Sequence, residues 1–228
     1  MAQRTQTRGP EAYDATPYVP QDADLQTLRH AAAGCQGCPL YRNATQTVFG
    51  SGDASARVVL IGEQPGDQED RKGLPFVGPA GGVLMRAIDE AGIDPADTYV
   101  TNAVKHFKFE RQERGKRRIH KPPNLREMAA CRPWLAAELR LLEPEVVIAL
   151  GASAGKALLG SSFRVTKERG AVLPMPSLDG GGEPAGGALV ATIHPSAVLR
   201  ADDAARAEVY AGLVSDLKVA ARLLRGKE

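Results

Sequence analysis

Short apolar runs alternate along this chain with longer stretches in which apolar residues recur every three or four positions. Four runs are rich in β-branched and apolar residues: 57–61, 98–101, 146–150 and 188–193. Such runs are typical of strands that are buried on both faces. The stretches between them have the spacing of amphipathic helices. Strands that alternate with helices predict an α/β fold with a mainly parallel sheet covered on both faces.

Capping residues and breakers predict where some helices begin and end. Leu25, Leu28 and Ala32 have helical spacing, and Gly34 follows them as a stop signal. Asn124 can cap a helix that continues past residue 139, in which Pro133 marks a kink or a restart. Another helix begins at 151–156, and a closing helix is expected over about 202–224.

The two ends of the chain differ in composition. Residues 1–21 are polar, contain scattered prolines and lack the apolar core of a secretory signal, which predicts a flexible N-terminal arm. Residues 22–228 are expected to form one domain, because 228 residues suit a single core. No apolar run approaches the ~20 residues of a membrane span. We expect a cytoplasmic monomer that does not bind membranes.

A basic segment, residues 105–123, changes this ordinary picture. Its eight Lys and Arg residues against two Glu carry a formal charge of +6, whereas the whole chain carries only +2. A basic segment on an otherwise acidic body is typical of proteins that bind a polyanion. The alternative is a solvated charged loop without a partner.

Polar residues follow three of the four apolar runs. Glu63 and Gln64 follow the first run, Asn102 follows the second, and His194 follows the fourth. In an open parallel sheet, the loops at the carboxyl ends of strands form the ligand site. Each residue alone could be a turn residue or a strand cap, but together they predict one cleft.

Three cysteines suggest a metal or cluster site. Cys35 and Cys38 form a C-x-x-C pair just after the first helix, and Cys131 lies far along the chain. An odd number of cysteines with one close pair suits a metal or cluster better than a disulfide framework. The alternative is three buried thiols that bind nothing.

Four motifs together resemble the family 4 uracil-DNA glycosylases. They are G-E-x-P-G at 62–66, F-x-G-x-A-G-G at 76–82, T-N-x-V-K at 101–105 and H-P-S-A at 194–197, and the resemblance covers roughly residues 24–224. It implies a three-layer α/β/α sandwich with a four-stranded, mainly parallel sheet. It also implies excision of uracil from DNA, preferably single-stranded, and a 4Fe-4S cluster held by four cysteines.

The chain departs from the family pattern at one of the implied cluster ligands. His106 stands where the family has its third cysteine, so that Cys35, Cys38, His106 and Cys131 would form the ligand set. Imidazole can replace thiolate on an iron-sulfur centre, but zinc accepts the same ligands. His30 is a weaker candidate ligand.

The basic segment also departs from family 4, because its K-R-R-I-H sequence at 116–120 resembles the UdgX branch of the superfamily. This resemblance implies that His120 attacks the sugar carbon exposed when uracil leaves, and that a covalent protein-DNA product forms. Glu63 would orient His120 or accept its proton, and His194 would stabilise the departing uracil anion.

The remaining implied roles concern binding. Gln64, Phe76, Asn102 and His194 would hold the extruded uracil, with Phe76 as the stacking face and the Asn102 amide on the polar edge. Lys116, Arg117 and Arg118 would contact phosphates. Two alternatives stay open: a turnover glycosylase that uses water, and a nonenzymatic cluster-bearing module that binds single-stranded DNA.

Overall fold

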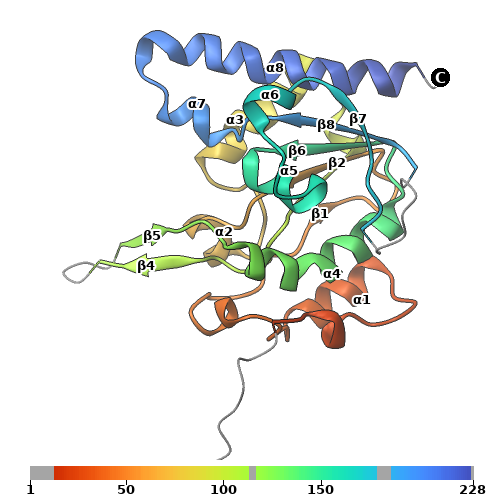
Figure 1. Cartoon of the computed structure of the whole chain (residues 1–228), viewed down its shortest axis with the longest axis vertical. Coiled ribbons are helices and arrows are strands. Elements are labelled where there is room, and N and C mark those ends of the chain that lie inside the picture. The colour runs from red at the N-terminus through yellow and green to blue at the C-terminus, as the bar shows by residue number, and fades with distance from the viewer. Residues whose placement is uncertain (1–12, 113–116, 179–185, 227–228) are drawn as a thin grey trace, which may run out of the picture.

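Six strands form one sheet in the computed structural model, which describes residues 13–112, 117–178 and 186–226 (Figure 1). In spatial order they are β1 (Ser51–Gly52), β3 (Thr98–Asn102), β2 (Val58–Gly62), β6 (Val146–Leu150), β8 (Ala188–Thr192) and β7 (Val172–Pro174). The four middle strands are parallel, and both edge strands are antiparallel to their neighbours. The predicted parallel strands are thus confirmed, and two short edge strands are added to them.

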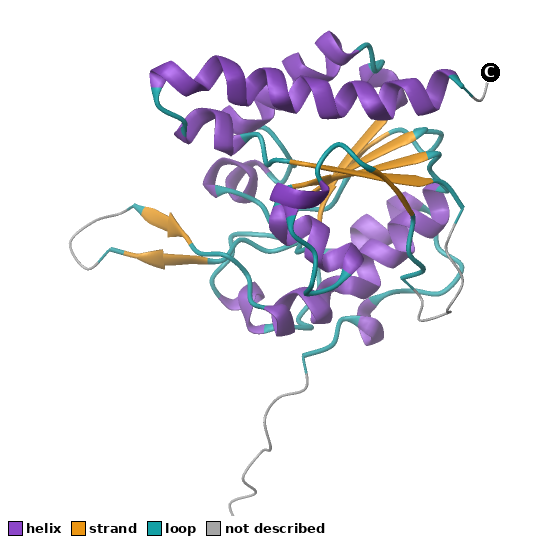
Figure 2. Ribbon diagram, turned by 45° about the horizontal axis from the view of Figure 1, so that its top comes forward, coloured by secondary structure: helices purple, strands orange, loops and turns teal. Residues whose placement is uncertain are grey.

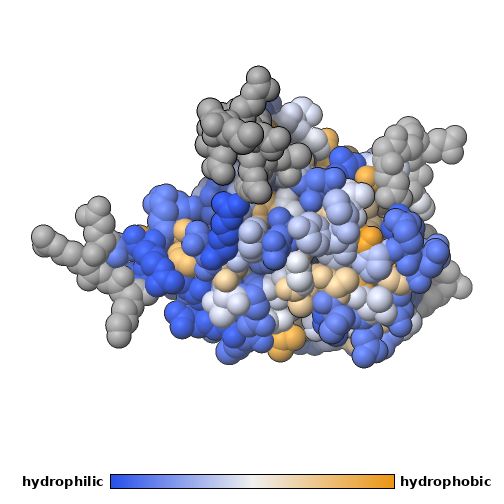
Figure 3. Space-filling view, turned by 90° about the horizontal axis from the view of Figure 1, so that it is seen from below, coloured by the Kyte–Doolittle hydropathy of each residue, from blue (hydrophilic) through white to orange (hydrophobic). Residues whose placement is uncertain are grey.

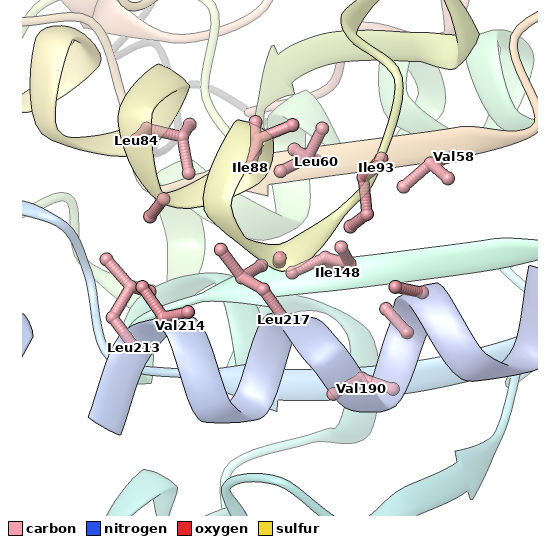
Figure 4. Packing of buried hydrophobic residues seen from close by; sticks show 14 of the residues in the cluster. Val58, Leu60, Leu84, Ile88, Ile93, Ile148, Val190, Leu213, Val214 and Leu217 are labelled. Atoms are coloured by element: carbon pink, nitrogen blue, oxygen red, sulfur yellow. The ribbon is translucent and has the colours of Figure 1, made fainter. Parts of the chain in front are cut away.

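One face of the sheet is covered by α3 (Pro79–Ala91) and α8 (Asp203–Arg225), with the short α7 (Ser196–Arg200) beside them. Figure 4 shows Val58 and Leu60 of β2 facing Ile88 of α3 and Leu217 of α8. All four side chains are fully buried or nearly so. Because side chains alternate along a strand, the residues between them face the opposite layer.

The opposite face is covered by α4 (Leu125–Leu142) and α5 (Ala152–Leu159), with α6 (Val165–Glu168) nearby. Val59 and Ile61 point to this side and pack with Leu135 and Leu158. Helices therefore cover both faces, and the predicted three-layer α/β/α sandwich is confirmed.

Helix α4 begins at the predicted cap and does not restart. Asn124 accepts from the Glu127 backbone, and the Glu127 side chain accepts from the Asn124 backbone, which makes a capping box. Of the kink or restart expected at Pro133, the restart does not occur, because Pro133 lies inside one continuous helix of 18 residues.

A third apolar cluster lies on the side of α4 away from the sheet, where α1 (Leu25–Ala32) packs against it. Two short 3-10 turns, η1 (Thr16–Tyr18) and η2 (Pro39–Arg42), flank this region, and a third, η3 (Pro95–Asp97), precedes β3. The Ala15 backbone donates to the Ala130 carbonyl at 3.0 Å, and Arg126 lies over the Tyr13 ring. The later part of the expected arm, residues 13–21, therefore contacts the body; residues 1–12 lie outside the described part.

The basic segment contains a two-stranded hairpin instead of the loop that the sequence predicts. Strand β4 (Phe109–Arg111) pairs antiparallel with β5 (Arg118–His120), and Phe109 lies opposite His120. The hairpin projects from the body next to α2 (Asp67–Lys72) (Figure 2). Three residues per strand are too few to show a period-2 pattern, which explains why sequence reasoning missed them.

Among the helices that the structure describes, none is long and apolar enough to cross a membrane.

Candidate active site

A cleft of about 840 Å³ lies at the carboxyl ends of the parallel strands. All six candidate catalytic and uracil-binding residues line its wall: Glu63, Gln64, Phe76, Asn102, His120 and His194. Ser153, which follows β6, also lines it. The structure thus brings together side chains that lie as far apart as residues 63 and 194, as the rule for parallel sheets predicts.

Asn102 and Phe76 meet above Gly62, the last residue of β2. A Cβ atom at Gly62 would lie 2.3 Å from Asn102 Oδ1 and 2.8 Å from the Phe76 ring, so only glycine admits both side chains. The Asn102 side chain is buried, and its backbone carbonyl accepts from Lys105 Nζ at 2.8 Å. A buried carboxamide beside an aromatic ring can recognise the edge and face of a flat heterocycle.

The Phe76 backbone is held in an unusual conformation, with a φ angle of 54°. Residues other than glycine, asparagine and aspartate rarely adopt this left-handed region, which costs about 1 kcal/mol or more. The chain comes so close to α3 here that a Cβ atom at Gly81 would lie 1.7 Å from the Phe76 carbonyl oxygen. Gly81, the second glycine of the F-x-G-x-A-G-G motif, thus permits the turn that directs Phe76 into the cleft.

His194 is neutral, and its tautomer follows from its hydrogen bonds. The Ser196 backbone N–H donates to His194 Nδ1 at 3.2 Å, so Nδ1 carries the lone pair and Nε2 carries the proton. Burial, with smaller contributions from Arg200 and His120, lowers the pKa of His194 to about 4. At neutral pH the ring is therefore an uncharged donor that can stabilise an anion in the cleft.

His120 reaches the cleft from the hairpin. Its Nε2 atom lies 2.9 Å from Gln64 Nε2 and 3.4 Å from Glu63 Oε1. The Lys108 backbone N–H donates to Gln64 Oε1 at 3.1 Å, which identifies the other Gln64 atom as the amide donor. The same amide group also donates to the Lys121 and Lys108 carbonyls at 2.9 Å and 3.2 Å, so both of its protons have backbone acceptors. His120 lines the cleft, which is where an imidazole nucleophile has to stand.

Arg118 is buried against the body, although it is expected to contact phosphate. Its side chain is only 6% exposed and pairs with Asp67 and with Asp70 Oδ2, the latter at 2.5 Å. The guanidinium also lies over the rings of Phe107 and Phe109. Its charge is thus neutralised within the protein, and the geometry supports an anchoring role for Arg118 in place of the expected phosphate contact.

The other two basic residues of the K-R-R-I-H sequence differ from Arg118. Arg117 is exposed just before β5, whereas Lys116 lies outside the described residues. Surface next to the projecting hairpin, on the left of Figure 3, is mostly hydrophilic. Arg117 is therefore free to face solvent while Arg118 faces inward.

The three cysteines are buried together in the third apolar cluster. The Trp134 ring N–H donates to Cys35 Sγ at 3.2 Å, and the Lys105 backbone N–H donates to Cys131 Sγ at 3.3 Å. Burial is the main cause that raises the pKa of Cys131 to about 12, while Lys105 opposes it and Cys38 and Cys35 add smaller upward contributions. Buried thiols that accept N–H hydrogen bonds are the kind of sulfur that ligates an iron-sulfur cluster.

His106 is buried next to this region, but no hydrogen bond links it to a cysteine. Thr47 donates its hydroxyl proton to the Ala32 carbonyl, so its oxygen accepts from His106 Nε2 at 2.9 Å. The His106 lone pair is therefore on Nδ1, and burial lowers the pKa of the ring to about 4. His30, the weaker candidate ligand, is exposed.

In the described part of the chain, no three His, Cys, Asp or Glu side chains are arranged to hold a single metal ion. A cluster with several iron atoms gives each ligand its own iron, so its ligands lie farther apart than those of one ion. The three thiols and the neutral His106 ring fit that donor set in chemistry.

Sequence reasoning missed three residues that the geometry brings into or next to the cleft: Asp67, Asp70 and Ser153. Ser153 had a usable signal, because it follows the third apolar run, whose carboxyl end belongs to the same edge of the sheet. The two aspartates had none beyond their position after the G-E-Q-P-G turn.

Comparisons with known proteins agree with this geometry. The family model of the uracil DNA glycosylase superfamily matches residues 49–218. A protein of Thermotoga maritima named type-4 uracil-DNA glycosylase is 37% identical over 182 residues, which cover 77% of this chain and 83% of that protein. A protein of Pyrobaculum aerophilum with the same name is 35% identical over 179 residues, covering 78% and 85%. The chain belongs to the uracil-DNA glycosylase superfamily.

Proposed function

We propose that this protein excises uracil from DNA and becomes covalently linked through His120 to the C1′ carbon of the resulting sugar. The observation that carries the proposal is the position of His120, which lines the cleft with its Nε2 atom 2.9 Å from Gln64 Nε2 and 3.4 Å from Glu63 Oε1. A neutral imidazole at this place competes with water for an electron-poor sugar carbon.

Uracil enters the cleft as an extruded base. Phe76 supplies the stacking face, and the Asn102 amide offers a donor and an acceptor to the uracil O4 carbonyl and the adjacent ring N–H. Gln64 stays bound to the hairpin backbone at Lys108 and Lys121 and shapes the wall of the cleft. Cytosine presents the opposite pattern on part of that edge, so its entry leaves buried polar groups unpaired.

Bond cleavage sends the electron pair of the C1′–N1 bond to uracil, which leaves as an anion. His194 donates its Nε2 proton as a hydrogen bond to that anion, and its neutral state follows from its low pKa. The His120 Nε2 lone pair then forms the bond to C1′, and the imidazole releases its Nδ1 proton to solvent, to which the side chain is 47% exposed. Glu63, on one side of the ring, stabilises the positive charge that passes through it.

The basic hairpin places this chemistry on a DNA strand. Arg117 and Lys116 contact phosphates, whereas Arg118 anchors the hairpin. A single strand is the preferred substrate because extrusion of a base that is already unpaired costs less. The protein acts as a monomer.

Cys35, Cys38 and Cys131, with His106 as a fourth ligand, would hold a 4Fe-4S cluster. When bound, the cluster supplies structural cross-links between α1, α4 and the segment that leads to the hairpin. It takes no part in the chemistry, since the cleft is built from other residues.

Denaturing gel electrophoresis tests the proposal against its two alternatives. The protein is mixed with single strands that contain uracil or thymine at one position. A band shift that resists denaturant, with uracil only, and that disappears in His120→Ala supports the covalent reaction. Free abasic DNA under multiple turnover would instead indicate a water-using glycosylase. Salt-sensitive binding without uracil release would indicate a nonenzymatic module.

A further inference from the structure

Ser153 lies in the cleft at the start of α5, on the strand end that sequence reasoning left out. The preceding Gly151 has a φ angle of 91° and donates its N–H to the Thr192 carbonyl at 2.8 Å. This glycine turn links the ends of β6 and β8 and directs the first turn of α5 into the cleft. The position of Ser153 is therefore set by the sheet.

The Ser153 hydroxyl donates a hydrogen bond to Glu63 Oε2. A carboxylate can only accept, so the direction of this bond is unambiguous. The other carboxylate oxygen, Oε1, lies 3.4 Å from His120 Nε2. Glu63 thus uses one oxygen for each neighbour, and its two partners lie 33 positions apart in the sequence.

The bond to Ser153 fixes the orientation of the Glu63 carboxylate. The backbone of Glu63 is held by Val104, whose N–H donates to the Glu63 carbonyl at 3.0 Å. The side chain, however, is 21% exposed and the last torsion of glutamate is broad. Without the hydroxyl, the carboxylate plane can turn away from the His120 ring toward water.

We propose that Ser153 is a positioning residue for the covalent step: its hydroxyl holds Glu63 Oε2 so that Oε1 faces His120 Nε2. This inference rests on the proposed function. The Ser153 hydroxyl donates to Glu63, and Ser153 therefore acts on the covalent step through Glu63. Ser153 therefore affects the ratio of covalent adduct to free abasic DNA, because the orientation of the His120 ring decides whether His120 or water attacks the sugar.

Two variants of nearly equal shape test the role of the hydroxyl: Ser153→Thr keeps it and Ser153→Val removes it. In Ser153→Val and Ser153→Ala we expect adduct formation to slow by about tenfold, the scale of one hydrogen bond to a charged group. A larger fraction of released uracil should then leave free abasic DNA. Ser153→Thr should recover most of the wild-type adduct fraction. Ser161→Ala, at an exposed serine, should change neither.

A double-mutant cycle separates positioning through Glu63 from a general structural effect. In a Glu63→Ala background, Ser153→Val should cause no further loss relative to Ser153→Thr, because the partner is gone. Equal adduct fractions in Ser153→Thr and Ser153→Val, or a full additional loss in the Glu63→Ala background, would overturn the inference.

Failure of the proposed function has a different signature. A wild-type protein that releases uracil without any adduct overturns the covalent step itself. The rate of uracil release is then measured in the same double-mutant cycle. Coupling between the effects of the Ser153 and Glu63 variants on that rate supports positioning, and strictly additive effects overturn it.

Discussion

Arg118 and His120 stand two residues apart on β5, so their side chains point to the same side of the hairpin. Arg118 pairs with Asp70 at 2.5 Å, and His120 reaches Gln64 at 2.9 Å. The ion pair therefore fixes the strand that carries the proposed nucleophile. The positive charge of Arg118, which we expected to contact DNA, thus holds the hairpin against the body.

Replacement of Arg118 should detach the hairpin from the body. Asp70 is fully buried, so Arg118→Met leaves its carboxylate without a cation, at a cost of about 3–5 kcal/mol in the anchored state. We expect adduct formation to fall by at least tenfold and proteolysis of the hairpin to become faster. Gel assays and limited proteolysis measure the two effects.

Arg117→Met is the matched control, because it removes the same chemical group from an exposed neighbour. It should leave the rate of proteolysis unchanged. The plot of log binding constant against log salt concentration should become less steep, with the magnitude of its negative slope smaller by about one. If both variants affect only DNA binding, Arg118 is not an anchor.

The buried neutral state of His194 should make stability depend on pH. Its pKa falls from 6.5 to about 4 on folding, chiefly through burial. Below pH 6.5 the unfolded chain takes up a proton that the folded chain excludes until about pH 4. The free energy of unfolding should therefore fall on acidification through this window, by at most about 3 kcal/mol from His194.

Urea unfolding of the wild type and of His194→Asn from pH 7 to pH 4 measures this contribution. The variant should lose less stability over the window, and His106 contributes equally to both proteins. Parallel curves for the two proteins would contradict the assignment of a low pKa to His194.

A buried ion pair should dominate the stability of the region behind the cleft. Lys105 and Glu138 are at most 1% exposed and lie 2.5 Å apart, and Tyr99 and Thr101 also donate to Glu138. Lys105→Met leaves Glu138 buried and uncompensated, so we expect a loss of about 3–5 kcal/mol. It also removes the donor to the Asn102 carbonyl, which should weaken uracil binding.

Chemical denaturation of Lys105→Met, Glu138→Gln and the double variant measures this pair, and the double variant should lose less than the sum of both single variants. Arg206→Met, which breaks the exposed pair with Asp203, should cost less than about 1 kcal/mol. Equal losses from the buried and the exposed pair would refute this prediction.

The proposed cluster should be visible and should depend on the buried sulfurs. Protein produced with iron should show iron-sulfur charge-transfer absorbance, which Cys38→Ala should abolish. His106→Cys should retain it, since thiolate is the commoner ligand, and His30→Ala should leave it unchanged. A colourless wild-type protein that contains zinc would rule the cluster out.

Local patterns were sufficient for the central architecture. The four β-branched runs predicted the parallel strands, and Asn124 predicted the start of α4, because both signals act within a few residues. The strand-end rule then grouped Glu63, Asn102 and His194 in one cleft. The edge strands β1 and β7, of two and three residues, carry no such pattern.

The sequence by itself determined the layers of the sandwich, the edge of the sheet where the cleft forms and the chemical types of residue that line it. Only the tertiary structure decided which of those residues act on one another. Arg118 turns inward to Asp70 across 48 positions, and Ser153 meets Glu63 across 90. Contacts at such separations depend on how layers pack, and no periodicity along the chain encodes the direction in which a single side chain points.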